Sequence, residues 1–263
     1  MSTDMYLANG LRLHCVRSGD QGGNPVLFLH GWPDSWFSFS RVLSSLSSTL
    51  NTVVFDQRGF GESDKPESGY AIGDFAADAI ALLDVLGIQR ATLVGHSFGS
   101  FVARRAALSH SDRVNGLVLI GTGFSTSNPV TRDLQNALRD LPDPIPESFA
   151  REFQQSTIYH PVPPEFFDRI VVESLKLLSR LWPTMIDSLL EYDDTGQLAG
   201  VRARTLLLWG DHDALFSRDD QDRFLTMLPS ARLKVYAETG HCPNWERPVD
   251  VAAEISRFVA ADD

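Results

Sequence analysis

The stretch of sequence that decides the fold is Ala91-Thr92-Leu93-Val94-Gly95-His96-Ser97-Phe98-Gly99-Ser100. An apolar strand pattern is followed at once by a sharp turn and then by an apolar helical pattern over residues 101–108. The small residues Gly95 and Gly99 suit a turn that strains the residue between them and brings strand and helix close together. A serine on such a turn is held out at the edge of a sheet, so Ser97 is predicted to be a nucleophile.

A serine nucleophile requires a base that takes its proton and an acid that orients this base. The expected chain order is serine, acid, histidine. His241 follows the last strand pattern and is predicted to be the base; the other six histidines fall in the first hairpin, in turns, near a helix end, beside the acid or after residue 123. Asp213 is predicted to be the acid rather than Asp211, because the residue directly after a strand more often caps a turn.

Two backbone N–H groups are expected to stabilise the oxyanion that forms on the substrate. The first belongs to Phe98, directly after the nucleophile. The second is expected from the loop after an earlier strand, Leu27-Phe28-Leu29-His30-Gly31-Trp32-Pro33, and is assigned to Trp32. The Trp32 indole is also predicted to line the substrate pocket.

Short and nearly continuous apolar runs predict parallel strands that are covered on both faces. These runs span residues 26–29, 52–55, 91–94, 116–120, 205–209 and 233–236. Asn9-Gly10 predicts a tight hairpin before them. Helical patterns lie between several runs, for example one with Asp74 as its N-cap and Gly87 past its end, and the last helix is expected to begin at Pro248. The alternation predicts an α/β fold with a mostly parallel, doubly wound sheet.

Residues 123–200 interrupt this alternation with proline-separated helical patterns and no convincing strand. We therefore predict a core over 1–122, an all-helical cap over 123–200 and the rest of the core over 201–263. A cap at this point lies over the carboxyl edge of the sheet, where open α/β sheets bind ligands. Tyr159, His160 and Trp182 are the cap residues predicted to contact substrate, together with Trp32.

Composition excludes several classes of function. The formal net charge of −11 opposes binding to nucleic acid or to anionic membrane surfaces. The chain has two cysteines and no CxxC pair, which favours a reducing cytoplasm and gives no sign of a metal site. No apolar run approaches the roughly 18 residues of a membrane span, and the N-terminus lacks a signal-peptide pattern. No cofactor is expected, and the sequence does not indicate an oligomeric state.

Two further motifs reveal a family resemblance that covers essentially the whole chain. They are His30-Gly31-Trp32-Pro33-Asp34-Ser35-Trp36 and Asp56-Gln57-Arg58-Gly59-Phe60-Gly61-Glu62-Ser63-Asp64-Lys65-Pro66. Together with Ser97 and its surroundings they resemble the α/β-hydrolase family, in the branch that contains epoxide hydrolases, haloalkane dehalogenases and related esterases and lactonases. The second motif is expected to be structural. Epoxide hydrolases and dehalogenases of this branch carry aspartate as the nucleophile, so Ser97 places the chain nearer the acyl-transfer members.

The sequence therefore predicts a serine hydrolase that cleaves a small neutral carboxylic ester or lactone. Among lactones, an N-acyl homoserine lactone is the first predicted substrate, and cleavage of such a lactone is called quorum quenching. A metal-dependent lactonase is disfavoured, because the sequence lacks the HxHxDH motif. Two alternatives stay open. One is a ligand receptor or signalling protein on the same fold, and the other is a cofactor-free oxygenase or perhydrolase.

Overall fold

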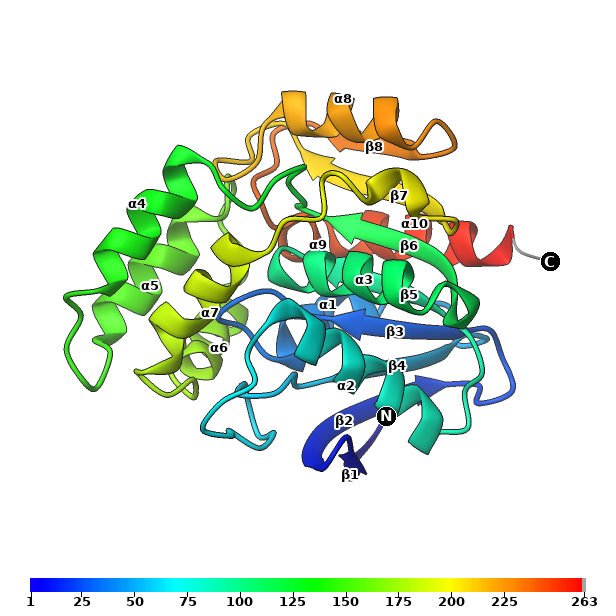
Figure 1. The fold of residues 1–263 in the computed structure, drawn as a ribbon, viewed down its shortest axis with the longest axis horizontal. Coiled ribbons are helices and arrows are strands. Elements are labelled where there is room, and N and C mark those ends of the chain that lie inside the picture. The colour runs from blue at the N-terminus through cyan, green and yellow to red at the C-terminus, as the bar shows by residue number, and fades with distance from the viewer. Residues whose placement is uncertain (262–263) are drawn as a thin grey trace.

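The computed structural model describes residues 1–261 and arranges them around one eight-stranded sheet with helices on both faces (Figure 1). The strand order is β1-β2-β4-β3-β5-β6-β7-β8. The strands are β1 (Ser2–Ala8), β2 (Leu11–Gly19), β3 (Pro25–Leu29), β4 (Asn51–Phe55), β5 (Ala91–His96), β6 (Val114–Ile120), β7 (Arg204–Gly210) and β8 (Arg232–Tyr236). Pairing is antiparallel at β1, β2 and β4 and parallel from β4 through β8, which confirms the mostly parallel sheet.

The first hairpin forms where the sequence predicts it. Asn9 and Gly10 have φ values of 50° and 77°, the left-handed conformation that a tight hairpin turn requires. Ala8 then pairs with Leu11, and the ladder continues to Ser2 opposite Arg17.

Alternate residues of each central strand face opposite layers of the core, because side chains on a strand alternate between its two faces. One layer takes Leu27, Leu29, Leu93, Leu117, Leu119 and Leu207. The other takes Val26, Phe28, Val94, Val118, Ile120 and Leu208. Since both faces are apolar, the central strands require helices on both sides, as predicted.

Helices cover both faces of the sheet (Figure 1). The face with the leucines is covered by α2 (Ile72–Val85), α3 (Phe98–Ser109) and α8 (Arg218–Met227), and the other face by α1 (Ser40–Leu43) and α10 (Pro248–Ala260). The short helix α9 (Pro243–Glu246) packs against α1 and α10. Residues 1–261 also form three short 3₁₀ turns, η1 (Trp36–Phe39), η2 (Ser111–Arg113) and η3 (Leu198–Gly200).

Helix starts test two predictions from the sequence. The last helix begins at Pro248 as expected. The prediction of Asp74 as an N-cap is wrong, because α2 begins at Ile72 and Asp74 lies in its first turn. There its carboxylate accepts the N–H of Ala71 at 3.0 Å, so it satisfies a free helix donor from inside the helix.

The strand β8 corrects the expectation that all six apolar runs are covered on both faces. It lies at the edge of the sheet, and Arg232, Lys234 and Val235 are exposed while Tyr236 is buried. Its charged side chains suit an edge, where lysine and arginine discourage pairing with another chain.

Residues 123–200, which we call the cap, contain four helices and no strand. The helices are α4 (Pro129–Leu138), α5 (Glu147–Ser156), α6 (Pro164–Ser174) and α7 (Leu181–Glu191). They lie at the end of the sheet toward which the parallel strands point (Figure 1). The cap boundaries stay a prediction, and residues 262–263 of the second core segment lie outside the described residues.

A buried ion pair joins the cap to the core. Arg104 on α3 donates from Nε to Asp194 at 2.9 Å, and its Nη1 donates to the Gly123 carbonyl at 2.8 Å. Both side chains are almost fully buried, so loss of either partner would leave an uncompensated charge. The two ends of the cap are thereby held to the helix that follows Ser97.

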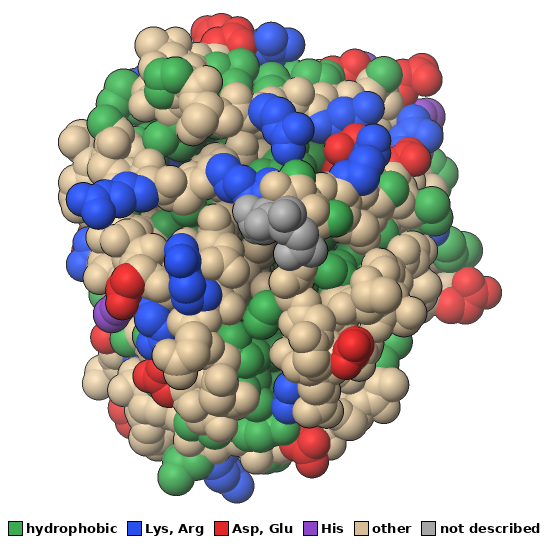
Figure 2. Space-filling view, turned by 90° about the vertical axis from the view of Figure 1, so that its right-hand side faces the viewer, with side chains coloured by type: hydrophobic (Ala, Val, Ile, Leu, Met, Phe, Trp, Pro, Cys, Tyr) green, Lys and Arg blue, Asp and Glu red, His purple; other side chains and the backbone are tan. Residues whose placement is uncertain are grey.

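The end of the molecule opposite the cap exposes charged side chains of both signs (Figure 2). No helix formed by residues 1–261 combines the length and the apolar composition that crossing a bilayer requires.

Candidate active site

Ser97 lies on a strained turn between β5 and α3. Its φ of 49° and ψ of −119° are unusual for a residue with a side chain. A Cβ atom on Gly99 would lie 2.1 Å from the Leu29 carbonyl oxygen, and one on Gly95 would lie 2.4 Å from the Gly99 carbonyl oxygen. The close approach that the motif predicts is confirmed, and it explains why both flanking positions are glycine.

His241 and Asp213 meet at the carboxyl edge of the sheet. The Nδ1 atom of His241 lies 3.0 Å from Oδ2 and 3.1 Å from Oδ1 of Asp213. A carboxylate only accepts hydrogen bonds, so Nδ1 donates and the lone pair of a neutral His241 is on Nε2. This Nε2 is buried and has no partner among residues 1–261, which leaves it available to take a proton.

The carboxylate of Asp213 is held in place by its own loop. Its Oδ1 accepts the backbone N–H groups of Leu215 at 2.8 Å and Phe216 at 3.1 Å. Asp211, the alternative acid, instead contacts the exposed neighbour His212 at 2.7 Å. The geometry therefore favours the predicted acid.

Ser97 and His241 line the same enclosed cavity beneath the cap. Its volume is small, about 30 Å³. The apolar part of the wall includes Leu134, Phe153, Ile186, Leu189, Phe216 and Trp245. A larger hollow of about 630 Å³ lies between α5 and α6 on the cap surface, but no histidine lines it.

The two predicted oxyanion donors lie on either side of the nucleophile. Phe98 is the first residue of α3, and the loop before Trp32 passes so close that a Cβ on Gly31 would lie 3.3 Å from Cβ of Ser97. Within residues 1–261 neither the Phe98 nor the Trp32 backbone N–H has an acceptor. Both amides are therefore free to bind an oxyanion, a role that stays a prediction.

The Trp32 side chain lines the cavity, but the predicted cap contacts are not brought to it. Trp182 is fully buried, donates its indole N–H to the Leu177 carbonyl at 3.2 Å and packs edge-on against the Trp32 ring. Tyr159 and His160 are also not among the lining residues; their backbone N–H groups donate to Glu246 at 3.2 and 2.8 Å. Trp182 therefore packs against a lining residue, and Tyr159 and His160 lie outside the cavity lining.

Asp34 is an acidic residue of the cavity lining that sequence reasoning did not select. It is 2% exposed, and its Oδ1 accepts an N–H from the Gln154 amide at 2.9 Å. Burial raises the pKa of Asp34 to about 7, although the Gln154 hydrogen bond and the proximity of His241 lower it in part. The sequence placed Asp34 two residues after Trp32 but gave no sign of its partner on α5.

The buried thiol of Cys242 also lines the cavity. Burial raises its pKa well above the usual value for cysteine, and it donates to the Thr157 hydroxyl at 3.3 Å. A thiol that keeps its proton is a poor nucleophile, so Cys242 does not compete with Ser97.

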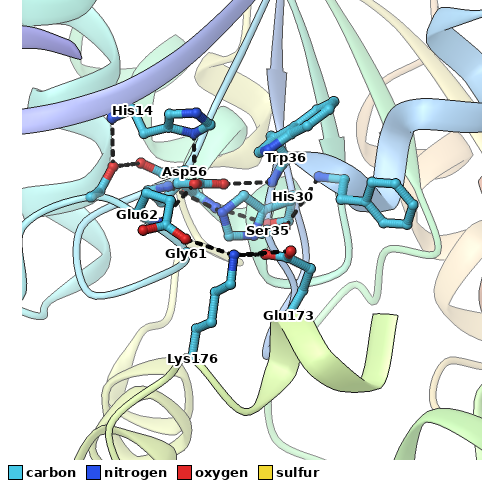
Figure 3. Close-up of polar contacts among 12 residues, drawn as sticks. His14, His30, Ser35, Trp36, Asp56, Gly61, Glu62, Glu173 and Lys176 are labelled. Atoms are coloured by element: carbon cyan, nitrogen blue, oxygen red, sulfur yellow. Dashed lines mark hydrogen bonds and ion pairs between the residues drawn. The ribbon is translucent and has the colours of Figure 1, made fainter. Parts of the chain in front are cut away.

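The motif that begins at Asp56 forms a polar network beneath the site (Figure 3). Asp56 accepts hydrogen bonds from Nδ1 of His14 at 2.8 Å, from the Trp36 N–H at 2.7 Å and from the Glu62 N–H at 3.0 Å. Lys176 of the cap donates to Glu62 at 2.7 Å and so joins this network to the cap. The structural role expected for the motif agrees with these contacts.

No three His, Cys, Asp or Glu side chains within residues 1–261 are grouped as a metal site would require. The chemistry that these residues can perform by themselves is attack by a hydroxyl, assisted by a base and two amide donors.

A family model for the alpha/beta hydrolase fold matches residues 24–248, and the chain belongs to this family. The match agrees with the mostly parallel sheet.

Individual relatives are similar over shorter segments or at lower identity. A soluble epoxide hydrolase from Corynebacterium sp. is 34% identical over 46% of this chain and 43% of its own length. The first such relatives are matched over only 32% to 43% of their own length. Among solved structures, an esterase from Exiguobacterium antarcticum has a TM-score of 0.89 at 21% identity, with 98% and 100% of the two chains covered. An enol-lactonase from Burkholderia xenovorans LB400 has a TM-score of 0.85 at 19% identity, again with 98% and 100% covered. These likenesses show the fold.

Proposed function

We propose that this hydrolase cleaves a carboxylic ester or lactone through an acyl-enzyme on Ser97. Nε2 of His241 takes the hydroxyl proton as Oγ attacks the carbonyl carbon, and the Trp32 and Phe98 amides bind the oxyanion. Collapse breaks the bond to the alkoxy oxygen, which receives the proton from His241. Water then attacks the acyl-enzyme with His241 as base and releases the acid.

One observation carries this proposal: a serine on a strained turn shares an enclosed cavity with a histidine whose Nε2 is free. Asp213 fixes the tautomer of that histidine. The relatives named as epoxide hydrolases belong to a branch that, by resemblance, uses aspartate at this turn. Serine forms an acyl ester that water can cleave, which favours esters and lactones over epoxides.

The cavity favours a small neutral acyl group. Its wall is mostly apolar and, among the lining residues, contains no lysine or arginine. An N-acyl homoserine lactone is the first lactone to test. Because the cavity volume is only about 30 Å³, we expect the cap helices to shift when a substrate with a longer acyl chain binds.

A reducing cytoplasm is the location that we include in the proposal. Cys15 and Cys242 are buried free thiols, which a reducing compartment preserves.

The test is hydrolysis of p-nitrophenyl esters of increasing acyl length, measured beside acyl homoserine lactones. We expect Ser97→Ala to lower kcat/KM at least about a thousandfold, because the other groups do not replace the nucleophile. Ser44→Ala, at an exposed serine outside the cavity, is the matched control and is expected to leave kcat/KM unchanged. Turnover that survives Ser97→Ala would contradict the mechanism.

A further inference from the structure

The carboxyl group of Asp34 is an acid in the cavity wall that the mechanism above does not use. Its Oδ1 is engaged by Gln154, which is itself 1% exposed and comes from α5 of the cap. Its Oδ2 lies 3.9 Å from Nδ1 of His96, beyond hydrogen-bond distance. That Nδ1 is buried and has no partner among residues 1–261.

His241 is the group facing Asp34 that can carry a positive charge, and its Nδ1 already contacts Asp213. Of the groups that face it, Gln154 on α5 and Ser38 on η1 are neutral, and His241 is engaged with Asp213. The residues that line the cavity include no lysine or arginine. Burial and the neighbouring His241 lower the pKa of His96 well below its usual value, so this ring stays uncharged at neutral pH.

Asp34 lies close to the place where an acyl group would be held. A Cβ atom built on Gly31 would lie 3.3 Å from Cβ of Ser97 and 3.4 Å from Oδ2 of Asp34. The acyl group is bonded to Oγ of Ser97 during half of the proposed reaction, so it stays near this carboxyl group. Charges in such an enclosed, mostly apolar site interact far more strongly than in water.

We propose that Asp34 is the specificity-determining residue of this cavity, and that it excludes substrates whose acyl group carries a negative charge. The inference rests on the proposed function, because it takes Ser97 as the atom to which the acyl group is bonded. Exclusion is expected to strengthen as pH rises through about 7, where Asp34 loses its proton. Below that pH a neutral Asp34 repels an anionic acyl group less.

A pair of esters of equal shape tests the proposal. Mono-p-nitrophenyl adipate is anionic, and p-nitrophenyl 6-oxoheptanoate replaces its carboxylate by a neutral acetyl group. We expect the wild-type chain at pH 8.5 to prefer the neutral ester between about ten- and a hundredfold in kcat/KM, as expected for one uncompensated charge a few ångströms away. At pH 6 the preference should fall severalfold, since the adipate stays ionised and Asp34 does not.

Two substitutions distinguish the effect of the Asp34 charge on this preference from the effect of the overall negative charge of the protein. Asp34→Asn keeps an oxygen that can accept the Gln154 hydrogen bond but removes the charge, and the preference should become small and independent of pH. Asp187→Asn removes one charge from an exposed cap residue outside the cavity lining, and it should keep the wild-type preference and its pH dependence. A preference that is the same in Asp34→Asn and wild type, or that does not change with pH in the wild type, would overturn the inference.

A binding measurement distinguishes failure of this inference from failure of the proposed function. Calorimetric titration of the wild-type chain with adipamide and with adipamate, a neutral and an anionic amide of equal shape, requires no turnover. Tighter binding of adipamide at pH 8.5 that is lost in Asp34→Asn supports the inference even if no ester is hydrolysed. Equal binding of the two amides, or no binding of either, would overturn it, whereas hydrolysis of any ester that depends on Ser97 would still support the proposed function.

Discussion

Two buried carboxyl groups close to the nucleophile differ in the donors around them: Asp34 lines the cavity, and Asp213 contacts His241 outside the cavity lining. Asp213 receives Nδ1 of His241 and two backbone N–H groups from its own loop. Asp34 receives one amide N–H from Gln154. A buried carboxylate is stable when several donors replace its hydration, and it returns to the neutral acid when they do not. Asp34, with fewer donors, has a pKa that burial raises to about 7, so donors as well as depth decide the charge of a buried acid.

The largest expected effect, a loss of kcat, comes from replacing Asp213. Asp213→Asn keeps the shape of the carboxylate but its amide can donate to Nδ1, which favours the wrong tautomer of His241. We expect kcat to fall about ten-thousandfold with the fold retained, by analogy with the same change in other serine hydrolases. The measurement is ester hydrolysis beside a circular dichroism spectrum. A loss of less than about tenfold would show that another acid orients His241.

A smaller effect is expected when the charge of Asp34 is removed. This change should raise the free energy of unfolding. Burial raises the pKa of Asp34 from 3.8 to about 7, so between these values the folded state holds a proton that the unfolded state has released. The free energy of unfolding therefore falls as pH rises through this window. Asp34→Asn should be more stable than wild type at pH 8 by up to ~4 kcal/mol, and this gain should shrink toward pH 4.

Urea unfolding of the two proteins at pH 4, 6 and 8 measures this difference. A gain that does not change with pH would show that Asp34 is not the group that titrates. Asp187→Asn serves again as the control, because its exposed carboxylate is expected to give little change.

The smallest effect is expected when the amide donor to Asp34 is removed. The Gln154 amide lowers the pKa of Asp34, so Gln154→Leu should raise that pKa further. The midpoint of the pH dependence of the neutral-to-anionic preference should then move upward, by about one pH unit, the scale of one hydrogen bond to a charge. A midpoint that moves downward would show that Gln154 does not stabilise the charged form.

Sequence reasoning succeeded where the determinants are local. Gly95, Ser97 and Gly99 sit within five positions, and steric contact alone explains the turn they form. Predictions from the sequence failed where a property depends on the order of strands in the sheet or on contacts between residues far apart in the chain. The exposure of β8 depends on its place in the strand order, which apolar content does not encode. The cap residues Tyr159, His160 and Trp182 have suitable chemistry, but they are not among the residues that line the cavity.

The sequence by itself determined the parallel sheet, the strained turn and the chain order of the predicted nucleophile, acid and base, because these depend on neighbouring residues and on where strands end. Only the tertiary structure decided that Asp34 is a cavity acid. Its amide donor, Gln154, is 120 positions away on the cap, and the absence of lysine and arginine from the cavity lining becomes visible only when the whole wall is assembled. A buried charge is set by everything that surrounds it, which is a property of packing and not of any single motif.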